Sequence, residues 1–183
     1  IVTAGDNSPA LVCADGAQVT VLNARLVCEG AGSPLIMTRG DVALSLRQST
    51  LSNTVSPAIE VHGGRLLLDI GNTLQLTGDI RLVTDEANPS PVTLDMSITD
   101  GSSFAGAIIA ATTDIINITL DQTSSWTLTG ELTIAALTAP DTDFLGIQSN
   151  GFNIYYNAEL AANAWLESQA YRLPGGGFLS PLI

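Results

Sequence analysis

The sequence predicts an all-β fold, a parallel β-solenoid in which the chain passes through three short strands in every coil. Three observations lead to this prediction. Apolar and polar residues alternate in five separate segments, the pattern of strands with one buried face. Each segment is followed by a polar turn, an apolar anchor, a Gly or Pro, and a third apolar segment. The anchors recur every 21–30 residues without a helical segment between them, which indicates a stacked repeat architecture.

The first strand of each unit is expected where apolar side chains alternate most regularly. In the segment 116–120, the isoleucines and leucine fall on one side of a strand, while Asn117 and Thr119 fall on the other. The expected first strands carry Val19/Val21, Val42/Leu44/Leu46, Leu66/Leu68/Ile70, Val92/Leu94/Met96/Ile98 and Ile116/Ile118/Leu120.

The second and third strands of each unit are expected around single large apolar anchors that follow turn residues. The second-strand anchors are Leu26, Leu51, Leu74, Phe104 and Trp126. The third-strand anchors are Ile36, Ile59, Ile80, Ile108 and Leu132. Glycine pairs and Gly-Asp steps lie between the units, as expected for tight turns.

The 183 residues are interpreted as one domain of about 5–6 coils, capped at both ends. We expect an N-terminal cap over 1–16, the coils over 17–140, and a last coil, C-terminal cap and apolar tail over 141–183. An insertion at 83–91 lengthens the third unit and is expected to loop out of the stack.

The last part of the chain leaves two alternatives open. Residues 157–168 are rich in helix formers, so a short capping helix and a final irregular coil are equally compatible with them. An apolar tail follows the glycines 175–177. This tail can fold back onto its own last coil, or it can add a strand to a neighbouring molecule.

The charge excludes some classes of partner. The formal net charge is −12, with no lysine and six arginines, and the pI is about 4.1. A nucleic-acid partner would require a basic stripe, and anionic membranes would repel this surface. No apolar run approaches the length of a membrane span, and the first residues suit a mature secreted chain without a signal peptide. We therefore expect an extracellular protein with no nucleic-acid partner and no membrane span.

The two cysteines, Cys13 and Cys28, lie 15 residues apart, a spacing close to one coil. A disulfide between them is expected to clamp the first coil and to stabilise it by roughly 3 kcal/mol. A pair of buried thiols is the alternative, because cysteine is among the residues most often buried.

Candidates for chemistry are sparse. Asp69 and Asp95 occupy outward strand positions on neighbouring coils, without an evident His or Arg cluster, and are interpreted as solvated carboxylates. His62 is the only histidine and precedes a Gly-Gly turn. No nucleotide-binding glycine loop and no zinc-spaced cysteine pair is present. We expect no catalytic residue, no cofactor and no metal; Asn117 begins a glycosylation sequon.

Several segments resemble repeats of a known group of proteins. The sequences of 100–106, 121–130, 151–156 and 171–177 are similar to repeats in secreted right-handed parallel β-helix proteins, including adhesin-like and autotransporter-passenger-like surface proteins. The resemblance implies a right-handed solenoid and an extracellular setting. It names no substrate and carries no catalytic residues.

The favoured functional hypothesis is a non-enzymatic structural protein whose subunits stack head to tail into surface or extracellular filaments. Open coil ends can template further strands, and a head-to-tail contact that does not close produces a filament. The expected subunit contacts are Ile1, Val2, Leu11, Val12, Phe178, Leu179, Leu182 and Ile183. The alternative is a monomeric adhesin that binds carbohydrate or a host surface through Tyr155, Trp165 or Tyr171, and a polysaccharide-acting enzyme comes third.

Overall fold

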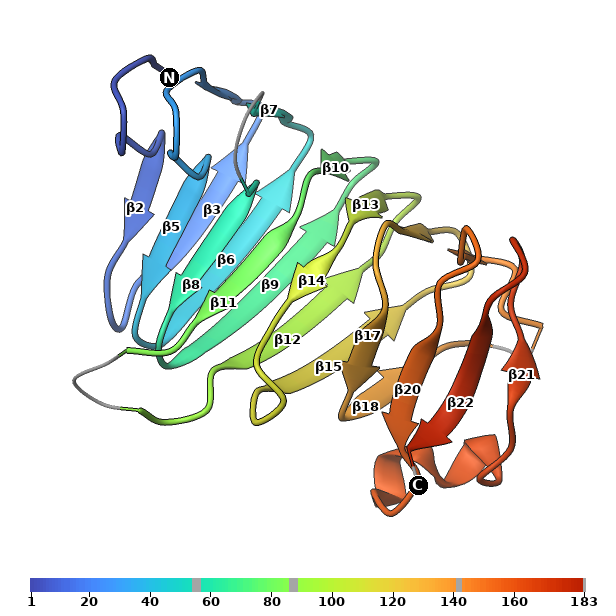
Figure 1. Cartoon of the computed structure of the whole chain (residues 1–183). Helices are drawn as coiled ribbons and strands as arrows, with labels where there is room; N and C mark the ends of the chain where they lie inside the picture. Colours follow the sequence, from blue (N-terminus) through green and yellow to red (C-terminus); the bar gives the residue numbers. More distant parts are fainter. Residues whose placement is uncertain (54–56, 86–88, 141–142, 183) are drawn as a thin grey trace.

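The chain forms a β-solenoid of about seven turns, built of parallel strands that stack along one axis. The computed structural model describes residues 1–53, 57–85, 89–140 and 143–182. Figure 1 shows the coils in sequence order, with the N-terminus at one end of the stack and the C-terminus at the other. The predicted fold class is confirmed, with slightly more coils than the 5–6 expected.

One face of the solenoid is a single six-stranded parallel sheet. Its neighbours follow the chain by one coil at each step, so alternate residues of every strand stack in straight ladders. The inward ladder Val19–Leu44–Leu68–Met96–Ile118–Leu137 joins all six strands. The strands are β3 (Gln18–Leu22), β6 (Val42–Arg47), β9 (Arg65–Gly71), β12 (Thr93–Ile98), β15 (Ile115–Leu120) and β18 (Ala136–Thr138).

A second face consists of two parallel sheets, one after the other along the axis. The first sheet holds β1 (Val2–Thr3), β4 (Arg25–Cys28) and β7 (Thr50–Asn53). The second sheet holds β10 (Gln75–Thr77), β13 (Ser103–Gly106), β16 (Ser125–Leu128) and β19 (Ile147–Gln148).

The third face is also divided in two. Its first sheet holds β2 (Leu11–Cys13), β5 (Ile36–Arg39), β8 (Ile59–His62), β11 (Ile80–Val83) and β14 (Ile108–Ile109). Its second sheet holds β17 (Leu132–Ile134), β20 (Ile154–Asn157), β22 (Phe178–Leu182) and the antiparallel β21 (Tyr171–Arg172). A short 3-10 helix, η1 (Ala161–Leu166), precedes β21.

The core confirms most of the predicted anchors and moves one of them. Phe104 and Trp126 stack in one ladder with Leu76, not with Leu74. The reason is the turn: Asn72 and Thr73 both adopt positive φ, so Leu74 closes the turn and the strand begins later. Both aromatic side chains are almost fully buried. Burial of each such side chain contributes about 1.5–3 kcal/mol.

The structure gives both ends of the chain a defined form. Residues 1–16, expected to form a cap, contain β1 and β2, which pair with β4 and β5 as ordinary members of the first coil. Of the two alternatives left open for 157–168, the structure has the short helix, in 3-10 form. No helix in the described ranges has the length and apolarity that a membrane crossing requires.

Candidate functional site

The N-terminal end of the solenoid exposes the inside of its first coil. Leu11 and Val19 occupy the same inward ladders as Ile36 and Leu44, which are essentially fully buried, yet both remain only half-buried. On the side facing away from the stack, β1, β2 and β3 have no paired strand among the described residues. Such unpaired edges are ready to pair with another chain.

Exposed apolar side chains surround this end. Of the predicted contact residues, Ile1, Val2 and Val12 are 66%, 66% and 56% exposed. Leu22, at the end of β3, is exposed as well, although the sequence analysis did not single it out. We call these four residues together with β1–β3 the N-terminal end surface.

The C-terminal end is closed by the chain itself. The inward residues of its last coils, Leu137, Ile147 and Leu179, are each fully buried. Helix η1 lies against β18, the last strand of the six-stranded sheet. Asn163 accepts a hydrogen bond from the Leu137 N–H at 3.0 Å and donates to the Ala135 carbonyl at 2.7 Å. Side-chain groups therefore satisfy the strand edge that would otherwise be open.

Aromatic side chains complete this closure. The Trp165 indole N–H donates to the carbonyl of Leu137 at 3.1 Å. Both Trp165 and Tyr171 pack against Phe144, with ring centroids 5.9 and 5.3 Å apart. Two of the three aromatic residues considered for sugar binding thus hold the C-terminal end together, while Tyr155 lies half-buried on the outer side of β20.

The apolar tail forms β22, which pairs in parallel with β20 of its own chain. Leu179 is fully buried in this sheet, whereas Phe178 and Leu182 are 45% and 54% exposed. Ile183, also predicted as a contact, lies outside the described residues. Of the two alternatives for the tail, the structure has the one in which it folds back.

The predicted disulfide is not formed: Cys13 and Cys28 are separate, buried thiols. The two residues lie in different sheets, and the Cys28 thiol donates toward the carbonyls of Ser8 and Ser33 at 3.7 and 3.6 Å. Burial raises the pKa of the Cys13 thiol, which keeps it protonated and unreactive.

Many aspartate carboxylates accept hydrogen bonds from backbone N–H groups in the turns. The Asp15 carboxylate accepts the N–H of Asp41 at 2.8 Å, and Asp41 in turn accepts the N–H of Arg65 at 2.9 Å, one coil further on. Asp6, Asp79, Asp114 and Asp121 also accept backbone N–H groups. The carboxylates supply hydrogen-bond acceptors for backbone N–H groups of the turns. The acidic composition thus has a structural cause.

Asp121 is the carboxylate most affected by these bonds. It accepts the N–H of Asp100 at 2.8 Å and both the N–H and the hydroxyl of Thr123 at 2.9 and 3.0 Å. Partial desolvation acts to raise its pKa, but the hydrogen bonds from Asp100, Ser124 and Thr123 together lower the pKa to about 2. Its role is to link successive turns.

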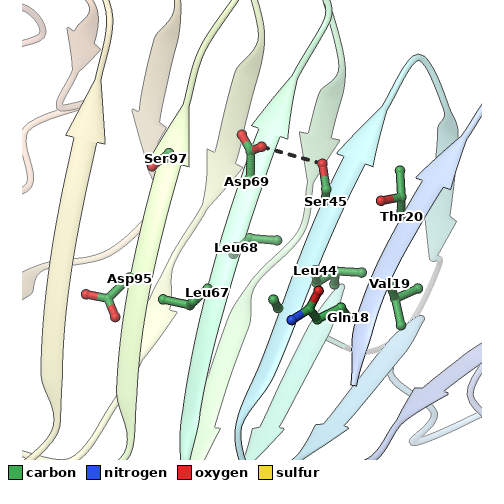
Figure 2. A pocket seen from close by; sticks show the side chains of 11 residues that line it. Gln18, Val19, Thr20, Leu44, Ser45, Leu67, Leu68, Asp69, Asp95 and Ser97 are labelled. Atoms are coloured by element: carbon green, nitrogen blue, oxygen red, sulfur yellow. Dashed lines mark hydrogen bonds between the residues drawn. The ribbon is translucent and has the colours of Figure 1, made fainter. Parts of the chain in front are cut away.

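The outer face of the six-stranded sheet carries a groove of about 510 Å³ across β3, β6, β9 and β12. Figure 2 shows the side chains along it, with Asp69 and Asp95 on neighbouring strands. A second hollow of about 250 Å³ shares three of its lining residues. We call the larger one the outer groove; its outward side chains are Gln18, Thr20, Ala43, Ser45, Leu67, Asp69, Asp95 and Ser97.

The two carboxylates of the outer groove are not isolated, contrary to the sequence analysis. Asp69 forms an ion pair with Arg47 and accepts from Ser45 at 3.5 Å. Asp95 accepts from Arg65 at 2.5 Å. Neither arginine was predicted to lie beside these carboxylates, although the spacing of Arg47 and Asp69, about one coil, was a signal for that pair.

The remaining candidates do not line this groove. Asn117, the sequon residue, is half-buried and donates its side-chain amide to Asp95 at 2.7 Å. His62 bonds to Glu60 at 2.7 Å on the outer side of β8. Among the described residues, no three His, Cys, Asp or Glu side chains are placed to hold one metal ion.

Comparison with protein-family models, with curated proteins and with solved structures found no match for this chain. The solenoid ends and the outer groove are therefore the features from which a function can be inferred.

Proposed function

We propose that this protein is a non-enzymatic, extracellular structural β-solenoid that associates end to end with a second copy of itself. The observation that carries the proposal is the contrast between the two ends. In the first coil the inward residues Leu11 and Val19 are half-buried, although Cys13 on the same strand as Leu11 is buried. In the last coils Leu137, Ile147 and Leu179 are fully buried. Association would remove the exposed apolar surface and pair the open strand edges at the N-terminal end surface.

The contact that we propose joins two N-terminal end surfaces, rather than the head and tail expected from the sequence. Here η1 covers the edge of β18, β21 pairs with β22, and Leu179 is buried within its own chain. A twofold contact uses the same patch on both subunits, which is the commonest form of homo-oligomer. It would place two β3 strands side by side in opposite directions, as in an antiparallel ladder.

The distribution of charge favours the same arrangement. Residues 1–47 contain four acidic residues and three arginines, whereas residues 136–183 contain four acidic residues and one arginine. Two N-terminal ends therefore repel each other less than an N-terminal end and a C-terminal end would. The extracellular setting belongs to the proposal and is supported by the lysine-free, acidic composition.

Light scattering coupled to size-exclusion chromatography tests the proposal over a range of protein concentrations. We expect particles of two copies, seen by electron microscopy as rods of twice the single length. Val12→Lys should shift them to single copies, because a lysine at a strand edge opposes pairing. Leu145→Lys is the matched control at the opposite end, where Leu145 is 77% exposed.

Three results would overturn the proposal in different ways. Single copies at every concentration would exclude self-association. Long filaments would favour the head-to-tail arrangement. Loss of pairing in Leu145→Lys, with pairing intact in Val12→Lys, would move the contact to the C-terminal end.

A further inference from the structure

The outer groove has the composition of a binding site rather than of a plain sheet surface. Its floor includes Leu67, which is 43% exposed, and Ala43 beside it on the neighbouring strand. Around this apolar floor lie hydroxyls, an amide and two carboxylates. A volume of about 510 Å³ lies within the range of small-molecule sites, which combine apolar walls with a few convergent polar groups.

The two carboxylates are held in fixed orientations. The Asp95 oxygens accept from Arg65 at 2.5 Å and from Asn117 at 2.7 Å, one oxygen to each donor. Arg47 and Ser45 both bond to the same oxygen of Asp69. A carboxylate oxygen has two lone pairs, so each Asp can accept further hydrogen bonds from a ligand. Acceptors fixed in this way lose little entropy when they bind.

A glycine makes the Asp69 arrangement sterically feasible. Gly71 lies in register with Arg47, and a Cβ at Gly71 would fall on the Arg47 guanidinium. Without that side chain, Arg47 crosses β9 to reach Asp69, and its other nitrogen lies 3.7 Å from Asp100. The glycine at position 71 therefore allows the Arg47 guanidinium to lie over β9, beside the groove.

Charge determines which class of ligand fits. Each groove carboxylate is balanced by one arginine, so the groove itself has little net charge. The whole chain carries −12, which repels anionic polymers. Three of the four strands beneath the groove, β6, β9 and β12, already pair on both sides and cannot accept an added peptide strand there. Recognition must use outward hydroxyl, amide and carboxylate groups.

We propose that the outer groove binds a neutral, hydroxyl-rich oligosaccharide. Asp69, Asp95 and Gln18 would bond to sugar hydroxyls, and Leu67 would contact the apolar face of a sugar ring. Neighbouring strands are spaced about 4.8 Å apart, comparable to one sugar unit along a chain, so equivalent groups on successive coils can meet successive units. The groove includes β3 of the N-terminal end surface, but the binding proposal does not require the proposed end-to-end association.

The test is a calorimetric titration of the full chain with neutral hexasaccharides of glucose, xylose and mannose. An oligogalacturonate and a six-residue neutral peptide serve as comparison probes. At least one neutral hexasaccharide should bind. Leu67→Ser should weaken that binding about tenfold or more, and Asp95→Asn should weaken it too. Ile115→Ser is the matched control, because Ile115 is 42% exposed on the same sheet face but outside the groove lining.

A further variant keeps the proposal falsifiable if Asp95→Asn disturbs the fold. Thr20→Arg adds bulk into the groove from an exposed position on β3 and should abolish binding while the far-ultraviolet circular dichroism is unchanged. The proposal is overturned if none of the neutral hexasaccharides binds at millimolar concentration. It is also overturned if the charged probe or the peptide binds better, or if Leu67→Ser and Ile115→Ser behave alike.

Discussion

The substitution Asn163→Asp tests how the C-terminal end is closed. Asn163 is 1% exposed and makes three hydrogen bonds. Its oxygen accepts the Leu137 N–H at 3.0 Å, and its nitrogen donates to the carbonyls of Ala135 and Asn157, both at 2.7 Å. The substitution keeps the shape and the acceptor, but it places a carboxylate oxygen against two carbonyl oxygens.

The expected cost follows from those two carbonyls. A buried polar group left without a partner costs about 1–3 kcal/mol. Two carbonyl groups that lose their donor should therefore lower the free energy of unfolding by about 2–6 kcal/mol, and repulsion from the carboxylate charge lowers it further. For a chain of this size each kilocalorie lowers the Tm by about 2–4 °C. We therefore expect the Tm at pH 7 to fall by about 5–20 °C.

The cost should depend on pH in a defined direction. The new carboxyl is buried, keeps only the Leu137 N–H as a donor and faces two carbonyl oxygens, so its pKa should lie above the ordinary value of about 3.9. A raised folded-state pKa means that the destabilisation grows as the pH rises through it. The variant should accordingly recover part of its stability at pH 4.

Thermal and urea denaturation, followed by circular dichroism at pH 7 and pH 4, measure both effects. Hydrogen exchange at the Leu137 amide reports the strand edge directly. Asn72→Asp is the control, since Asn72 is exposed and the change adds the same charge. A free energy of unfolding for Asn163→Asp within about 0.5 kcal/mol of the unsubstituted chain at pH 7 would contradict the expected cost. Lower stability at pH 4 than at pH 7, relative to the control, would contradict the expected pH dependence.

Three other changes have outcomes that follow from contacts already described. Asp121→Asn should cost about 1 kcal/mol at pH 6 after solvent screening. Because the pKa of Asp121 is lowered to about 2, its contribution is present above about pH 4 and is lost as the pH falls, so urea denaturation should find little difference at pH 2. Gly71→Ala should cost about 1 kcal/mol by displacing Arg47, but nothing in an Arg47→Ala background. Deleting 178–182 should lower the stability by about 3–5 kcal/mol, since Leu179 is buried and β22 pairs with β20, yet pairs of molecules should still form.

Each of these changes has an outcome that contradicts it. If Asp121→Asn lowers the free energy of unfolding more at pH 2 than at pH 6, the expected pH dependence is wrong. Equal costs of Gly71→Ala in both backgrounds would exclude the contact with Arg47. If the chain without 178–182 remains folded but is found only as single molecules, the tail takes part in the contact between subunits.

The strand ladders are the part of the fold that the sequence predicted best. Ile36, Ile59, Ile80 and Ile108 form one inward ladder, as expected. Alternation decides which face of a strand is buried, and a shift by one residue would expose that whole face. The register is therefore encoded locally, strand by strand.

Lateral contacts between coils were not predictable in the same way. Arg65 meets Asp95 across 30 residues, because the insertion at 83–91 lengthens that coil, while Arg47 meets Asp69 across 22. Which charges become neighbours depends on the length of every intervening turn. The structure does not describe residues 86–88 within that insertion, but it does define the strands on either side.

The sequence by itself determined the solenoid and its buried ladders, because the burial of alternating apolar residues depends on local period alone. Its excess of aspartates, interpreted as surface charge, proved to bond the backbone of neighbouring turns, as Asp15 and Asp41 do. Only the tertiary structure showed which residues close the C-terminal end. Asn163, Trp165 and β22 all pack onto coils that lie far back in the chain, and such contacts depend on the stacked geometry rather than on any local pattern.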